Sequence, residues 1–227
     1  MNRSCRSQKQ ILILPSILSA DSEKLAEEVA DVAGAADGIH IDYMDGFFVP
    51  NKTIFAPSLV KRLRRTTGLF FDVHIMAKNP DVLVGAFAEA GADLITVHLE
   101  ACSDVSRALT KIRGFGKKAG LALRPETPVA EIKDLIISLD LLLIMTVHPG
   151  RSGQKFIENS PGKIKEAADL LRDKAPDIML EVDGGIDLDN IGMAASMGAN
   201  VFVSGKTIFS SSGRSEIISE MRTRALV

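Results

Sequence analysis

Short apolar runs alternate with amphipathic stretches eight times along this chain of 227 residues. The apolar runs span residues 11–14, 39–42, 69–75, 93–99, 120–123, 141–147, 178–182 and 200–204. Helical segments are predicted after them, up to 35, at 57–65, from 79, at 103–118, 128–137, 160–174 and 188–197, and up to 221. Most of the apolar runs are continuous rather than alternating, which is typical of parallel strands covered by helices.

Eight strand–helix units in a chain of this length predict an α/β fold, a single (β/α)8 TIM barrel. The alternative is an open, doubly wound sheet, but no G-x-G-x-x-G motif opens the first helix. Residues 11–227 are therefore predicted to form one catalytic barrel domain, and residues 1–10 a flexible N-terminal tail.

The charge balance argues against a polyanionic partner. The formal net charge is −2, from 27 basic and 29 acidic residues that are interspersed along the chain. A nucleic-acid-binding or anionic-membrane-binding protein usually carries a basic patch or stripe, and none stands out here. We therefore expect no nucleic acid and no membrane as partners, while a small anionic substrate stays compatible with a locally positive site.

Cysteine use and hydropathy bear on the compartment. The two cysteines, Cys5 and Cys102, give no pattern of a disulfide framework, which indicates a reducing environment. The longest apolar run, 139–147, is far shorter than the ~20 residues that a membrane helix needs. No apolar segment of signal-peptide type precedes the first strand. A cytoplasmic location is expected.

The four histidines of the chain all fall in or just after the second half of a predicted strand. In a (β/α)8 barrel the active site lies at the carboxyl ends of the strands. A single histidine is usually an ordinary core or surface residue, but the shared placement of all four predicts a site. They are His40, His74, His98 and His148.

Carboxylates accompany two of these histidines. His40 and Asp42 are two residues apart on one strand, so period-two alternation points both toward the same side. Asp72 and His74 repeat the spacing, with Asp72 deeper, and Asp183 follows the seventh strand. The set His40, Asp42, His74 and Asp183 suits a divalent zinc, iron(II), manganese or cobalt ion. The alternative is a buried network of ion pairs.

Glycine-rich segments follow the last three strands. Backbone amides in such loops can hold a phosphate, and barrels often place this site after strands seven and eight. Glycine after a strand is also ordinary turn chemistry, so the clustering is what favours a phosphate site, and Arg151 and Lys206 could add positive charge. The candidate residues are Gly150, Arg151, Ser152, Gly153, Gly184, Gly185, Ser204, Gly205 and Lys206.

Three methionines lie near the ends of predicted strands two, three and six. Methionine is most often a filler of the core. At these positions Met44, Met76 and Met145 could also form an apolar wall that keeps water away from a reactive intermediate.

Several of these motifs, taken in order, resemble one family. They include LPSILSAD at 14–21, HIDYMDG at 40–46, DVHIM at 72–76, VHLE at 97–100 and EVDGGI at 181–186. With further matches at 145–156 and 203–205, the chain resembles the ribulose-phosphate 3-epimerases from about residue 14 to residue 211.

The resemblance implies a TIM barrel of the ribulose-phosphate-binding type and a homo-oligomer. It also implies a divalent metal held by His40, Asp42, His74 and Asp183, with Asp42 and Asp183 as the two acid/base groups. The implied reaction interconverts D-ribulose 5-phosphate and D-xylulose 5-phosphate, a step of the pentose phosphate pathway, by inverting C3 through a metal-stabilised enediolate. Ser16, His74, His98 and His148 would contact the substrate, and the glycine-rich loops would bind its phosphate.

Some residues depart from the usual pattern of this family. They are Tyr43, His148, Arg151, Ser152 and Lys206, none of them an implied metal or acid/base position. Most of these departures lie near the predicted phosphate site, so they concern the substrate rather than the reaction. The alternatives are a 3-epimerase for another ketose phosphate, such as D-allulose 6-phosphate, and a non-catalytic phosphosugar-binding relative.

Overall fold

The structure is a computed structural model in which residues 10–226 are described, so the predicted tail lies almost wholly outside the described residues. Eight parallel strands form one sheet in the order β1-β8-β7-β6-β5-β4-β3-β2. The strands are β1 (Leu12–Pro15), β2 (Gly38–Met44), β3 (Phe70–Met76), β4 (Leu94–His98), β5 (Lys118–Leu123), β6 (Leu141–Met145), β7 (Met179–Asp183) and β8 (Val201–Ser204). The predicted parallel sheet is confirmed.

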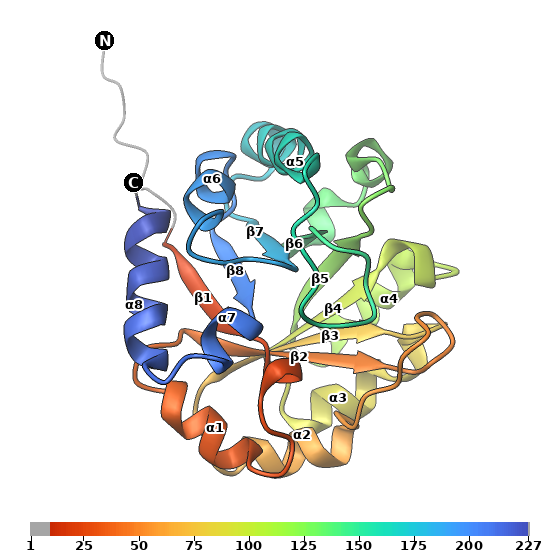
Figure 1. Ribbon diagram of the computed structural model, residues 1–227. Helices are drawn as coiled ribbons and strands as arrows, with labels where there is room; N and C mark the ends of the chain where they lie inside the picture. Colours follow the sequence, from red (N-terminus) through yellow and green to blue (C-terminus); the bar gives the residue numbers. More distant parts are fainter. Residues whose placement is uncertain (1–9, 227) are drawn as a thin grey trace.

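The sheet closes on itself between its two outer strands. Ser16, directly after β1, forms a parallel bridge with His40 of β2, so the barrel closes beside a predicted site residue. Figure 1 shows the strands as an inner ring with the helices around it. The (β/α)8 barrel that the sequence predicts is therefore confirmed.

Helices cover the outside of the strands. The α-helices are α1 (Leu25–Val32), α2 (Pro57–Arg64), α3 (Val84–Ala90), α4 (Val105–Gly114), α5 (Ser160–Lys174), α6 (Ile191–Ser196), α7 (Lys206–Phe209) and α8 (Arg214–Ala225). The 3₁₀ helices are η1 (Ile17–Ser19), η2 (Pro80–Val82), η3 (Leu99–Ala101), η4 (Val129–Ile132) and η5 (Ile136–Ser138). Within the described residues, no helix combines the length and apolar character that crossing a membrane requires.

Several predicted helices differ from the structure, and at two of them the local sequence explains the difference. The helix predicted over 128–137 is wrong, because the segment forms the 3₁₀ helices η4 and η5. Its β-branched residues lose side-chain freedom in an α-helix, which favours shorter turns. The helix predicted to reach residue 118 ends at Gly114. Gly116 adopts a left-handed φ of 70°, which ends the helix, and Lys118 begins β5.

The core has two layers, because successive strand residues point to opposite faces. One set packs against the helices in a large cluster that includes Ile39, Ile41, Phe71 and Phe202. The other set fills the barrel, where Leu94, Leu141, Leu143 and Met145 pack together. The filled interior supports polar side chains at the carboxyl end of the barrel.

Candidate active site

Strand register brings the predicted ligands together. In the parallel pair β2–β3, His40 lies opposite Asp72, and Asp42 lies opposite His74. All four side chains are buried, as period-two alternation predicts for residues that point into the barrel. Asp183, at the end of β7, comes from the opposite side of the ring. Residues that are 143 positions apart in sequence (40 to 183) thus meet in one site.

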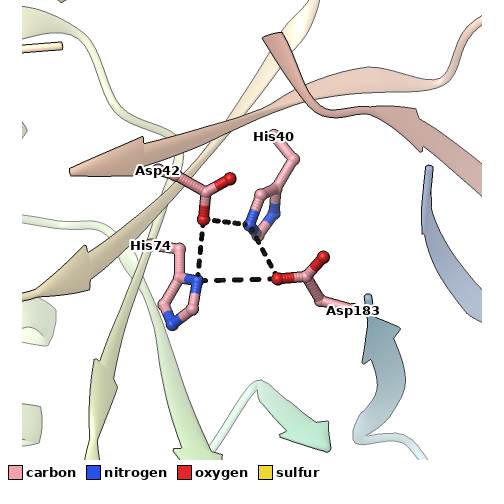
Figure 2. Close-up of side chains that lie close together, drawn as sticks. All are labelled: His40, Asp42, His74 and Asp183. Carbon is pink, nitrogen blue, oxygen red and sulfur yellow. Dashed lines mark hydrogen bonds and ion pairs between the residues drawn. The ribbon is translucent and has the colours of Figure 1, made fainter. Parts of the chain in front are cut away.

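The four side chains alternate, carboxylate and imidazole, around a common centre (Figure 2). Asp42 Oδ1 lies 3.3 Å from His40 Nε2 and 3.1 Å from His74 Nδ1. Asp183 Oδ2 lies 3.9 Å from His40 Nε2 and 4.0 Å from His74 Nδ1. Each residue therefore directs one donor atom inward, and these atoms all lie within 4.8 Å of one another.

This arrangement fits a divalent metal. Ligand atoms at about 2.1 Å from a tetrahedral ion are about 3.4 Å apart, close to the separations found here. His40 Nε2 is buried and makes no hydrogen bond to any described residue, although it faces the centre. A buried polar nitrogen without a hydrogen bond is costly, and a cation at the centre would give it a partner.

The charges around His40 also favour a cation. Burial lowers the pKa of His40, but the neighbouring Asp42 and Asp72 outweigh burial and raise that pKa well above its ordinary value. The surrounding carboxylates therefore stabilise a positive charge at this imidazole. A divalent ion that displaces the Nε2 proton would take over that charge.

The two aspartates of the site have opposite pKa shifts. Burial raises the pKa of Asp42, but the charge of His40 and a hydrogen bond from His74 outweigh burial and hold that pKa well below its usual range. Burial, together with the charge of Asp42, raises the pKa of Asp183 to about 6. Without a metal ion, the cluster thus holds two carboxyl groups whose pKa values are shifted in opposite directions.

Two further carboxylates lie deeper in the barrel, below His40. His40 Nδ1 lies 2.6 Å from Asp72 Oδ2 and 3.3 Å from Glu181 Oε1. His40, Asp72 and Glu181 form a second group with metal-ligand chemistry, but Nδ1 of His40 is already bonded to Asp72. Burial and the neighbouring Asp72 raise the pKa of Glu181 well above its ordinary value. This group therefore supports His40 from behind.

On the other side, hydrogen bonds run outward from His74. Its Nε2 lies 2.9 Å from His98 Nε2, and His98 Nδ1 lies 3.1 Å from Glu100 Oε2. Burial lowers the pKa of His98 to about 4. Burial would raise the pKa of Glu100, but hydrogen bonds from His98, Thr127 and the Arg124 backbone outweigh it and lower that pKa to about 2.

A cavity of about 720 Å³ opens above the cluster. Asp42 and Asp183 form part of its lining, which also includes most of the predicted substrate contacts. The predicted residues that line it are Ser16, Met44, Met76, Met145, Gly150, Arg151, Ser152, Gly153, Gly184, Gly185, Gly205 and Lys206.

Four predicted substrate contacts do not line this cavity. His148 lies beyond the end of β6, has a side chain that is 72% exposed, and faces Glu126 at 3.7 Å. Ser204 is buried, and its hydroxyl donates a hydrogen bond to the Ile186 carbonyl at 2.8 Å. His98 is buried, with hydrogen bonds at both ring nitrogens. His74, also predicted to touch substrate, lies fully buried in the metal cluster below the cavity.

Backbone geometry explains the glycines of the phosphate loops. Gly184 and Gly185 have left-handed φ values of 117° and 69°. A Cβ at Gly185 would lie 2.4 Å from the backbone nitrogen of Phe156. Glycine therefore lets the loops after β6 and β7 approach each other at the cavity wall.

The sequence reasoning missed several residues that shape the cavity. Ser19 lines it with a buried hydroxyl that has no hydrogen-bond partner among the described residues. Asn190 donates to the Gly185 carbonyl at 2.7 Å, and Asn51 donates to the Gly150 carbonyl at 2.7 Å. Gln154 donates to the carbonyl of His148 at 2.6 Å. None of these residues stands out in a single sequence, because their positions depend on loop conformations that only the folded chain shows.

The fold and the cluster together define a class of protein. A (β/α)8 barrel that carries a two-histidine, two-aspartate cluster under a glycine-lined cavity has the organisation of a barrel enzyme with a candidate metal centre. The sequence profile described as the ribulose-phosphate 3 epimerase family matches residues 12–209. The chain belongs to this family.

Similar proteins of the same family match nearly all of the chain. The chain is 46% identical to a ribulose-phosphate 3-epimerase of Bacillus subtilis (strain 168) over 214 residues, which are 93% of this chain and 98% of that protein. It is 44% identical to a ribulose-phosphate 3-epimerase of Escherichia coli (strain K12) over 218 residues, 95% of this chain and 96% of that protein.

Solved structures of other barrel proteins share the fold. A 3-keto-L-gulonate-6-phosphate decarboxylase from Vibrio cholerae has a TM-score of 0.71 and 14% identity, over 96% of this chain and 98% of that one. An orotidine 5'-phosphate decarboxylase from Pyrococcus horikoshii has a TM-score of 0.69 and 13% identity, over 95% and 100% of the two chains. At this identity the likeness concerns the fold alone.

Proposed function

We propose that the protein inverts C3 of D-ribulose 5-phosphate to give D-xylulose 5-phosphate. The observation that carries this proposal is the placement of Asp42 and Asp183. They lie at opposite corners of the cluster, come from opposite sides of the barrel, and both reach the cavity floor. Membership of the family supports the same reaction.

Epimerisation next to a ketone requires removal of one proton and return of another on the opposite face. One base cannot easily serve both faces, whereas two carboxylates on opposite sides of the substrate can. Asp42 and Asp183 face the cavity from opposite corners of the cluster, so one would accept the C3 proton and the other would return a proton on the opposite face. In the reverse direction the two roles exchange.

His40, Asp42, His74 and Asp183 would hold the divalent metal of this family, with zinc, iron(II), manganese and cobalt as candidates. When bound, such an ion polarises the carbonyl beside C3 and stabilises the negative charge that develops there. The chain itself supplies the orientation, because His40 and His74 are each hydrogen-bonded on the side away from the centre.

The cavity walls would hold the substrate between the aspartates. Three methionines line the cavity, and each is at most 2% exposed: Met44, Met76 and Met145. They can keep water away from a reactive carbanion. The glycine loops, with Arg151 and Lys206 at the same cavity, would bind the phosphate and fix the position of C3. Ser16, whose hydroxyl lies 3.0 Å from Asp42 Oδ2, would contact the reacting end.

The remaining predictions belong to the same proposal. A cytoplasmic location and assembly into a homo-oligomer rest on the composition and on the resemblance to the family, respectively.

Replacing either aspartate tests the proposal. Asp42→Asn and Asp183→Asn should each lower epimerisation of D-ribulose 5-phosphate by at least about a thousandfold, because a positioned acid or base contributes 10²–10⁴-fold and both are required. Circular dichroism should show an unchanged fold. Asp169→Asn, on the exposed face of α5, is the control and should keep full activity. Near-full activity in either site variant would overturn the two-base assignment.

A further inference from the structure

We infer that His98 and Glu100 are positioning residues that keep the Nε2 proton on His74, so that His74 Nδ1 is free for the metal. This inference rests on the metal site of the proposed function. It assigns His98 a role behind the cluster instead of a contact with substrate.

The first step is the contact between the two imidazoles. His74 Nε2 and His98 Nε2 lie 2.9 Å apart, a hydrogen-bond distance that leaves room for one proton between them. Both side chains are fully buried, so water does not compete for either nitrogen. Whichever ring donates, the other must accept with a lone pair.

Glu100 decides which ring donates. Its Oε1 accepts hydrogen bonds from the Arg124 backbone N–H, at 2.8 Å, and from the Thr127 hydroxyl. Its Oε2 lies 3.1 Å from His98 Nδ1. A carboxylate only accepts, so the proton of the neutral His98 ring lies on Nδ1 and its Nε2 carries the lone pair. His74 must then donate from Nε2.

The consequence appears at the cluster. His74 Nδ1 lies between Asp42 Oδ1 and Asp183 Oδ2, and without an ion it donates a hydrogen bond to Asp42 Oδ1 at 3.1 Å. A metal ion would displace that Nδ1 proton and take its lone pair, while the Nε2 proton stays directed at His98. His40 is oriented by a carboxylate directly, without an intervening histidine, since its Nδ1 lies 2.6 Å from Asp72 Oδ2. Each ligand histidine is thus oriented by a carboxylate behind it, directly for His40 and through His98 for His74.

Glu100→Gln is the decisive variant, because the surroundings dictate how the new amide must lie. The Oε1 position faces the Arg124 N–H, which can only donate, so the amide oxygen must occupy it. The amide NH₂ then faces His98 Nδ1 and requires a lone pair there. His98 is forced to carry its proton on Nε2, which points at His74 Nε2 and requires that nitrogen to lose its proton.

Nitrogen-15 NMR of histidine-labelled, metal-free protein reads this change directly, and only four histidines contribute. In the unmodified protein we expect His98 protonated on Nδ1 and His74 protonated on Nε2. In Glu100→Gln we expect His98 protonated on Nε2 and no proton on His74 Nε2. Zinc affinity, measured by competition with a chelator, should fall by about 10–100-fold.

Two further variants separate this effect from loss of charge or of packing. Glu126→Gln removes the carboxylate that faces the exposed His148, and should change neither zinc affinity nor the signals of His74 and His98. His98→Gln offers an amide oxygen to His74 Nε2 and an NH₂ group to Glu100. It should therefore keep the proton on His74 Nε2 and most of the zinc affinity.

A His74 that carries no proton on Nε2 in the unmodified protein would overturn the inference, whether or not the variants fold. Unchanged histidine signals and zinc affinity in folded Glu100→Gln would also overturn it. The NMR and zinc measurements use no substrate. A protein that fails to epimerise D-ribulose 5-phosphate would therefore refute the proposed function and leave the tautomer result intact.

Discussion

At the scale of the residue, burial turns His98 into a stability-determining group as well as a hydrogen-bonding one. Its side chain has no exposed surface, and burial lowers its pKa to about 4. In an unfolded chain a histidine has a pKa near 6.5. Between these two values the unfolded chain binds a proton that the folded protein does not bind.

This difference predicts how the metal-free protein responds to acid. The pKa of His98 is lower in the folded protein than in the unfolded chain. Above pH 6.5 His98 is neutral in both states and does not change the free energy of unfolding. As the pH drops from about 6.5 to about 4, protonation of the unfolded chain lowers that free energy. The free energy of unfolding that is lost through His98 over this range is on the order of 3 kcal/mol. Urea unfolding of the metal-free protein across this range measures it, and His98→Gln should remove that part of the pH dependence. An identical slope in the variant would contradict the assigned pKa.

The site could be predicted in part because alternation along a strand is a local property. His40 with Asp42, and Asp72 below His74, follow from period-two spacing alone. His148 does not, because β6 ends at Met145 and alternation no longer sets side-chain direction in the loop. The pairing of His74 with His98 depends on how β3 and β4 align, which a single sequence does not fix.

At the scale of the element, the loop after β6 shapes one wall of the cavity. Its backbone is held from both sides, by Asn51 at the Gly150 carbonyl and by the close approach of Gly185 to Phe156. Ser152 lines the cavity between these anchors, at the proposed phosphate site. These anchoring contacts do not involve the Ser152 side chain, so Ser152 can be replaced without changing the loop conformation.

Ser152→Gly tests whether this loop binds the phosphate. Loss of one hydrogen bond of about 1 kcal/mol should raise KM roughly fivefold and leave kcat nearly unchanged, because the bond is made equally in the ground and transition states. Steady-state kinetics with D-ribulose 5-phosphate measures both values. A fall in kcat at constant KM would place the loop outside the phosphate site.

The strands were easier to predict from the sequence than the helices. The continuous apolar runs predicted all eight strands, since burial on both faces leaves a strong local signal. The segment 128–137 was wrongly predicted as one helix, because its apolar spacing serves equally for the 3₁₀ helices η4 and η5. The helix α1 ends at Val32 rather than near residue 35, and α6 begins at Ile191 rather than at residue 188, because turns form at 33–35 and 188–190.

At the scale of the whole molecule, the close-packed side chains inside the barrel support the residues of the site. Leu143 of β6 is fully buried within it and packs with Leu94 and Leu141 below the cluster. A close-packed interior collapses only partly around a deleted side chain, so the cavity left behind adds to the loss of burial.

Leu143→Ala should therefore lower the free energy of unfolding by about 2–5 kcal/mol. Ile137→Ala, at a residue that is 82% exposed, is the matched control and should change it by less than about 0.5 kcal/mol. Urea unfolding followed by circular dichroism measures both. A similar small effect for both variants would mean that the barrel interior contributes little to stability.

The central claim is that Asp42 and Asp183 exchange the C3 proton on opposite faces of a pentulose phosphate. The most direct test is NMR of solvent-deuterium incorporation at C3, with metal-loaded protein and D-ribulose 5-phosphate, and with D-allulose 6-phosphate in parallel. We predict deuterium at C3 together with formation of D-xylulose 5-phosphate. No exchange despite bound metal, or exchange with the six-carbon substrate alone, would contradict the account.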